Sequence, residues 1–116
     1  MNIEDYRYFC LSFQAVTEEM PFGPDTLVFK VCGKMFALTD IDRFESVNLK
    51  CDPEKAIALR EKYTEVTPGY HMNKKHWVTV KTSGSIGDDL IKAWTTDSYN
   101  LVVDSLPLKE KNKLRT

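Results

Sequence analysis

The segment from Thr26 to Lys50 constrains the fold more than any other part of the sequence. Its side chains repeat with a period of two, which is typical of β-strands because successive side chains of a strand point to opposite faces. Turn residues divide the segment into three stretches, at residues 26–31, 35–39 and 43–50. Connections this short join neighbouring antiparallel strands. The sequence therefore predicts a three-stranded antiparallel meander.

Helical patterns flank this meander. Asn2 is a suitable N-cap for a helix that runs to about Thr17, because apolar residues recur at intervals of three and four after it. Asp52 and Pro53 open a second helix, since an acceptor side chain is favoured at the cap and proline at the first helical position. We expect this second helix to end near Tyr63.

The C-terminal third of the chain predicts one more strand and further helices. Residues 76–81 alternate again, which places Trp77 and Val78 on opposite faces of a strand. Ser85 is the expected N-cap of the next helix. The polar run Thr95–Asp97 is a poor helix interior, so we expect a break there and a separate last helix.

These elements follow the order helix, three strands, helix, one or two strands, and one or two helices. An antiparallel sheet flanked by helices in two layers is an α+β fold. With 116 residues the chain is close to the commonest domain size, so we expect a single domain over residues 1–116. Residues 107–116 are rich in lysine and arginine, and we expect a flexible basic tail there.

Composition and charge limit the classes of function. A net charge of −1 and a pI of about 6.1 argue against a protein that coats DNA through its overall field, so any anion site is a local patch. Three widely spaced cysteines, Cys10, Cys32 and Cys51, are typical of reduced thiols. The apolar runs are too short to cross a membrane, and the acidic and aromatic N-terminus is unlike a signal peptide. We expect a cytoplasmic protein.

The stretch from Thr67 to Lys81 carries the main functional signal. No acidic residue occurs from Val66 to Gly87. An acid-free segment on a nearly neutral domain can attract an anion, and nucleic acid is the leading candidate. Lysines would neutralise phosphates, while polar and aromatic side chains would contact bases. The candidate residues for this DNA contact are Tyr70, His71, Asn73, Lys74, Lys75, Trp77 and Lys81.

The sequence gives little support for catalysis or metal binding. His71 and His76 are the only histidines, and neither follows a nucleophile motif such as GxSxG. Their spacing relative to Cys32 and Cys51 matches no common set of metal ligands. We therefore expect a protein that is not an enzyme and that uses no metal or other cofactor.

Four segments of the chain carry a family resemblance. They read PFGPDTLVFKVCGKMFAL (21–38), VNLKCDPEKAIALREKY (47–63), PGYHMNKKHWVTV (68–80) and SYNLVVDSLP (98–107). In order and spacing they resemble the MmcQ/YjbR family of small bacterial proteins. The resemblance implies a fold of the CyaY-like or secretion-chaperone-like α+β type and a role in DNA binding. Val78 departs from the family, which usually has Asn after the His-Trp pair, and this removes one polar contact.

A protein- or peptide-binding module of the chaperone-like type is the alternative. Small α+β domains bind partner segments, or a second copy of themselves, through sheet edges and apolar faces. Met20, Met35 and Met72 would supply adaptable contact surface. An uncovered apolar sheet face would favour a protein partner, whereas a continuous basic groove around Lys74 would favour nucleic acid.

Overall fold

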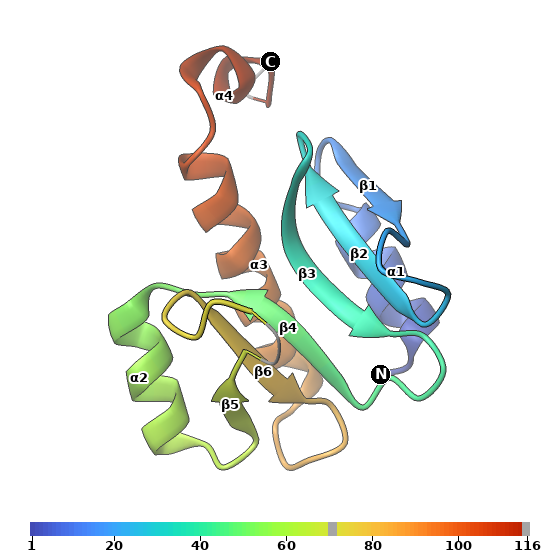
Figure 1. The fold of residues 1–116 in the computed structure, drawn as a ribbon, viewed down its shortest axis with the longest axis vertical. Helices are drawn as coiled ribbons and strands as arrows, with labels where there is room; N and C mark the ends of the chain where they lie inside the picture. The colour runs from blue at the N-terminus through green and yellow to red at the C-terminus, as the bar shows by residue number, and fades with distance from the viewer. Residues whose placement is uncertain (70–71, 115–116) are drawn as a thin grey trace.

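The structure is a computed structural model that describes residues 1–69 and 72–114 (Figure 1). Over these residues it contains four helices and one six-stranded antiparallel sheet with the strand order β1-β2-β3-β4-β6-β5. The predicted α+β class and element order are confirmed. The elements are α1 (Ile3–Leu11), β1 (Val16–Glu19), β2 (Thr26–Val31), β3 (Lys34–Asp40), β4 (Ser46–Lys50), α2 (Pro53–Lys62), β5 (Val66–Pro68), β6 (Trp77–Lys81), α3 (Asp88–Asp104) and α4 (Leu108–Leu114).

The predicted meander forms β2, β3 and β4. Val28 pairs with Leu38, and Leu38 pairs with Asn48, so these side chains form one row across the sheet. β6 then pairs with β4 on its other side and places Thr79 opposite Asn48. Residues in such a row point to the same face of the sheet, so this register assigns each strand residue to one of two faces.

One face of the sheet carries the main core. Helices α1 and α3 lie behind the sheet in Figure 1, and α2 lies beside β5. We call the face toward α1 and α3 the helix-covered face. Its fully buried side chains come from two helices, α1 and α3, and from the strands β2, β3, β4 and β6. They include Tyr6, Phe29, Phe36, Val47, Leu49, Val80, Ile91 and Val102. Burial of this apolar surface is the largest favourable contribution to folding.

A serine of α3 joins two strands beyond the end of their direct pairing. β3 and β4 pair only over 37–39 and 47–49. The backbone N–H of Lys50 donates to Ser98 Oγ at 2.8 Å, and the Ser98 hydroxyl donates to the carbonyl oxygen of Phe36 at 2.6 Å. Ser98 is fully buried, so this one hydroxyl satisfies two backbone groups and fixes α3 against the sheet.

The first helix is shorter than predicted. α1 ends at Leu11, and residues Val16–Glu19 form the edge strand β1. Ala15 has φ of 62°, a left-handed conformation that turns the chain out of the helix. Phe13 stacks on Tyr99 with ring centroids 4.6 Å apart, which fixes the turn against α3. Tertiary packing and pairing with β2 therefore override the helical spacing that we extended to Thr17.

The predicted break at Thr95–Asp97 is wrong, because α3 runs without interruption through these residues. The Thr95 hydroxyl donates to the carbonyl oxygen of Ile91 at 2.7 Å and is also hydrogen-bonded to the Tyr6 hydroxyl at 2.9 Å. A hydroxyl satisfied in this way is compatible with a helix interior. The N-cap is Gly87 rather than Ser85.

The C-terminal segment also differs from the expected flexible tail. Residues Leu108–Leu114 form helix α4, which lies beyond the end of the sheet at the top of Figure 1. Leu114 packs against the main core. That contact gives the short helix an apolar attachment, which the lysine-rich sequence did not suggest.

Candidate nucleic-acid interface and helix cleft

The face of the sheet opposite to α1 and α3 carries a second, smaller apolar cluster, and we call it the open face. Val28, Leu38 and Trp77 are buried there, with Met35 and Met72 partly buried beside them. A hollow of about 390 Å³ lies next to this cluster. Its lining combines apolar and polar side chains, namely Phe22, Thr26, Leu38, Thr39, Asp40, Ser46, Asn48 and Met72.

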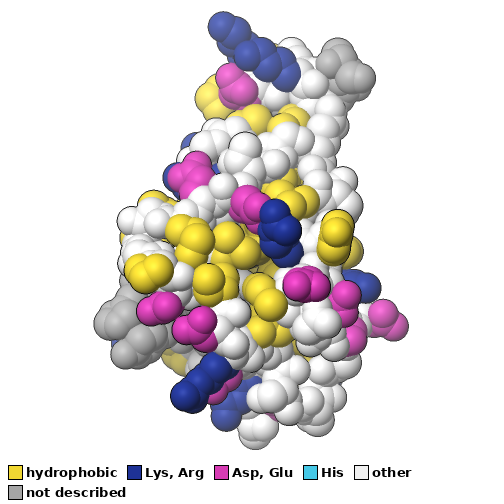
Figure 2. Space-filling model, turned by 90° about the vertical axis from the view of Figure 1, so that its right-hand side faces the viewer, with side chains coloured by type: hydrophobic (Ala, Val, Ile, Leu, Met, Phe, Trp, Pro, Cys, Tyr) yellow, Lys and Arg dark blue, Asp and Glu magenta, His cyan; other side chains and the backbone are white. Residues whose placement is uncertain are grey.

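Apolar and charged side chains also mix on the side of the molecule that carries β1 and β2. Figure 2 shows hydrophobic side chains in the middle of this side, acidic and basic side chains around them, and a separate group of basic side chains at the α4 end. Lys30 pairs with Glu19 at 3.0 Å, and Arg7 pairs with Glu18 at 2.5 Å. These two positive charges are therefore balanced by neighbouring carboxylates.

The described part of the loop before β6 packs closely on the open face. The N–H of Gly69 donates to the carbonyl oxygen of Trp77 at 3.0 Å, which continues the pairing of β5 and β6. A Cβ at Gly69 would lie 2.7 Å from the Cβ of Trp77, so glycine is needed here for close approach. Trp77 itself is 8% exposed and forms part of the apolar cluster. It is thus poorly placed to stack on a base.

The described polar residues of the loop are exposed, and hydrogen bonds hold its backbone. Asn73 Oδ1 accepts a hydrogen bond from the N–H of Lys75 at 2.9 Å, which forms a turn. Arg60 of α2 donates to the carbonyl oxygen of Lys74 at 3.4 Å. Both lysine side chains point into solvent. Two further candidates, Tyr70 and His71, lie outside the described residues.

The lysines of this region keep their charge free for a partner. Lys74, Lys75 and Lys81 are exposed, and none of them forms an ion pair with a described carboxylate. Glu65, the acid that precedes β5, is hydrogen-bonded to Ser85 and forms no ion pair with these lysines. It accepts hydrogen bonds from the Ser85 hydroxyl and from the Ser85 N–H, the latter at 3.0 Å. The Ser85 hydroxyl is the main reason why the pKa of Glu65 falls from 4.5 to about 2.

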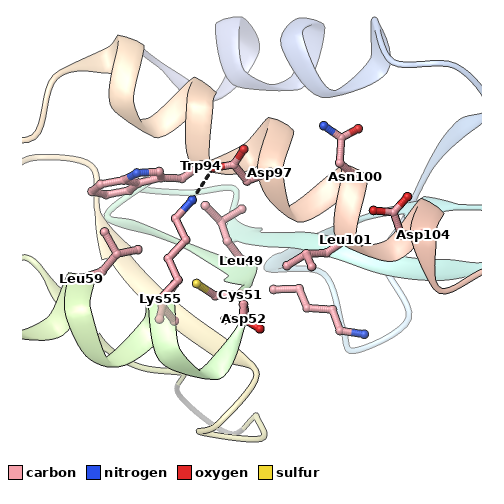
Figure 3. Close-up of a pocket in the computed structure, with 12 residues that line it drawn as sticks. Leu49, Cys51, Asp52, Lys55, Leu59, Trp94, Asp97, Asn100, Leu101 and Asp104 are labelled. Carbon is pink, nitrogen blue, oxygen red and sulfur yellow. Dashed lines mark hydrogen bonds and ion pairs between the residues drawn. The ribbon is translucent and has the colours of Figure 1, made fainter.

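A cleft between α2 and α3 forms a separate site that the sequence did not reveal (Figure 3). Its volume is about 260 Å³. Apolar side chains from β4, β6 and both helices line it: Leu49, Leu59, Val78, Trp94 and Leu101. Charged and polar side chains also line it: Lys50, Asp52, Lys55, Asp97, Asn100 and Asp104. One ion pair crosses the cleft, from Lys55 Nζ to Asp97 Oδ2 at 2.5 Å.

The α3 side of the cleft follows from helix geometry. Trp94, Asp97, Leu101 and Asp104 are spaced by three, four and three residues, so they lie along one stripe of the helix. Two carboxylates on the same stripe as a buried tryptophan are a signal that could have revealed this cleft from the sequence.

The cleft also contains a thiol, Cys51. This residue is 6% exposed, and burial is the main reason why the pKa of its thiol is raised. The thiol is therefore neutral near pH 7, which does not favour metal binding. Among the described residues, no group of three or more His, Cys, Asp and Glu side chains could hold a metal ion. No described helix is long and apolar enough to span a bilayer.

Comparisons with known proteins are consistent with the architecture. The YjbR family model matches residues 11–101. YbdF of Escherichia coli O157:H7 is 42% identical over 96 residues, which cover 82% of this chain and 79% of YbdF. YjbR of Escherichia coli K12 is 32% identical over 115 residues, which cover 98% of this chain and 97% of YjbR.

Solved structures show the same similarity in three dimensions. The crystal structure of the Deinococcus radiodurans protein DR2400, described with a DUF419 domain, has a TM-score of 0.90 and 38% identity. That match covers 97% of this chain and 87% of DR2400. A Pseudomonas syringae protein has a TM-score of 0.74 and 29% identity, and the match covers 87% of this chain and 98% of that one.

Proposed function

The chain belongs to the YjbR family, and on that premise we propose that it is a cytoplasmic, non-enzymatic DNA-binding protein. The resemblance of its sequence to the MmcQ/YjbR family implies this role. The observation in this chain that carries the proposal is a charge pattern. Three exposed lysines, Lys74, Lys75 and Lys81, lie in a stretch of 22 residues without an acid and form no ion pair with a described carboxylate.

The lysines would contact phosphates, and the loop would orient them. Asn73 holds the backbone of Lys75 through its side chain, while Arg60 holds the carbonyl oxygen of Lys74. Such contacts limit the conformations of the loop, so less entropy is lost when DNA binds. Tyr70 and His71 remain candidates for base contacts from the same loop. Trp77 is buried and packs beside Met72, so it holds the loop in place instead of contacting a base.

Three phosphate contacts predict weak binding with a moderate dependence on salt. The slope of log K against log[salt] is expected to be roughly −2 to −3. The experiment is fluorescence anisotropy with duplex and single-stranded oligonucleotides across a salt series. Removing two phosphate contacts in the double variant Lys74→Ala, Lys75→Ala should reduce the slope by about 2 and weaken binding to all sequences alike.

A second pair of lysines provides the matched control. Lys109 and Lys111 lie on α4, far from the loop in Figure 1, so Lys109→Ala with Lys111→Ala removes the same charge at a distant place. We expect this variant to bind as the parent does. If both double variants lose affinity equally, binding follows overall charge and the loop is not the site. If the parent binds neither oligonucleotide at low salt, the DNA proposal is wrong.

The hollow on the open face supports the second candidate, binding of an extended peptide with an apolar side chain. Phe22 is 63% exposed at this hollow, and Leu38 and Met72 extend the apolar lining. The test is a peptide array of apolar hexamers with Phe22→Ser, and with Tyr8→Ser as a control because Tyr8 is 76% exposed on α1. Selective loss of binding in Phe22→Ser supports the peptide candidate, whereas equal binding by both variants excludes the hollow.

A further inference from the structure

We infer that the cleft between α2 and α3 binds a small aromatic or branched aliphatic amine. This site is separate from the lysine loop: Figure 3 shows its lining side chains between the two helices, above the end of β4. The inference combines the volume of the cleft, its apolar walls and the sign of the charge at its mouth.

The volume limits the ligand to a small molecule. An apolar cavity of about 150 Å³ accepts benzene, so a cleft of about 260 Å³ accommodates roughly ten non-hydrogen atoms. This volume lies just below the range of typical drug-sized pockets, and neither a folded segment nor a nucleic-acid strand would fit inside. One ring with a short side chain has the required size.

The walls favour an apolar body with a ring. Trp94 is held edge-on by Tyr63, with ring centroids 5.3 Å apart, so its indole is a fixed surface for a second ring. Leu49 and Leu101 face the same space from β4 and α3 (Figure 3). Fixed walls of this kind are typical of sites that are formed before the ligand arrives.

The charged side chains favour a cation over an anion. Three carboxylates line the cleft against two ammonium groups. Lys55 and Asp97 neutralise each other across the cleft. Asp52 and Asp104 form no ion pair with a described basic side chain, so only Lys50 opposes them. An ammonium group next to Asp104 would gain a charge-assisted hydrogen bond, and the side-chain oxygen of Asn100 one turn earlier would add a second acceptor.

Three matched probes test the inference on the full chain: 2-phenylethylamine, the neutral 2-phenylethanol and the anionic 3-phenylpropionate. Binding is followed by the chemical shifts of backbone amides in two-dimensional NMR. We expect saturable shifts with the amine at about millimolar concentration or below, confined to the end of β4, the start of β6, helix α2 and residues 94–104 of α3. The alcohol and the carboxylate should bind at least about tenfold more weakly.

Two variants and one control assign the site. Leu101→Trp fills the cleft and should abolish the shifts, while circular dichroism and the melting temperature verify that the variant is folded. Asp104→Asn should weaken the amine about tenfold and leave the alcohol unchanged, because only the charged probe uses this carboxylate. Asp89→Asn removes an exposed acid from the first turn of the same helix and should have no effect.

Several outcomes would overturn the inference. The first is a lack of saturable shifts with 2-phenylethylamine up to about 10 mM, which corresponds to negligible affinity. The second is equal affinity for 2-phenylethylamine and for the carboxylate probe. Unchanged binding in folded Leu101→Trp would equally exclude the cleft. None of these outcomes depends on DNA binding, so failure here leaves the function proposed for the lysine loop untouched.

Discussion

The two faces of one sheet differ in what holds them together. On the helix-covered face, apolar side chains from α1, α2, α3 and the strands β2 to β6 form one continuous core. The open face alternates with it along the same strands, but the buried apolar cluster that the described residues form there is limited to Val28, Leu38 and Trp77, beside polar rows such as Asn48 and Thr79. One face therefore supplies most of the stability, which leaves the other free to carry binding residues.

The largest expected difference between the faces concerns apolar side chains. Phe29→Ala on the helix-covered face should lower the free energy of unfolding by about 3–5 kcal/mol, because the fixed core cannot close the cavity. Leu38→Ala on the open face should lower the free energy of unfolding by about 2 kcal/mol, which is at the low end for leucine-to-alanine substitutions, because the small cluster around Leu38 can relax. Urea unfolding measures both. Equal losses would show that the open face is a core of the same kind.

Hydrogen bonds should show the same contrast at a smaller scale. Ser98→Ala removes the hydroxyl that joins Phe36 and Lys50 inside the core, and should cost about 1–3 kcal/mol because buried backbone groups lose a partner. Thr79→Val removes the hydroxyl that donates to Asn48 Oδ1 at 2.5 Å on the open face. Water can replace that partner, so about 1 kcal/mol or less is expected. A larger loss for Thr79→Val in chemical denaturation would contradict this order.

The smallest effect concerns pH at the end of the sheet. In the folded chain the pKa of Glu65 is about 2, below its usual 4.5. A lowered pKa contributes stability above pH 4.5, and this contribution disappears as the pH falls through about 2. Glu65→Gln should therefore show a shallower decrease of the melting temperature between these two pH values. Parallel melting curves for both proteins across that range would exclude the effect, while Glu61→Gln serves as an exposed control.

The parts of the fold that the sequence predicted are those that depend on neighbouring residues. Strands β2, β3 and β4 follow each other through short turns, so their alternation and register can be inferred locally. Strand β1 could not be inferred locally, because Val16 also suits a helix. Pairing with β2 decides that this segment is a strand. The continuity of α3 through Thr95 depends likewise on Tyr6, which is distant in the sequence.

The candidate sites show the same limit. The absence of acids around Lys74 and Lys75 is a local property, and their exposure agrees with it. Burial of Trp77 depends on Val28 and Leu38 of other strands, so its contribution to the site could not be decided from its own segment. The cleft requires α2 and α3 to lie on either side of it next to β4, which no single stretch of sequence specifies.

The central place of β4 has a consequence for the order in which the chain folds. Its partner β3 comes just before it in the sequence, whereas its other partner β6 arrives only after α2 and β5. Closing the longer loop costs more entropy, so the meander should assemble early and β6 should dock later. Contacts that form after the rate-limiting step mainly slow unfolding. Substitutions in β6 are thus expected to change how long the native state survives, rather than how fast it is reached.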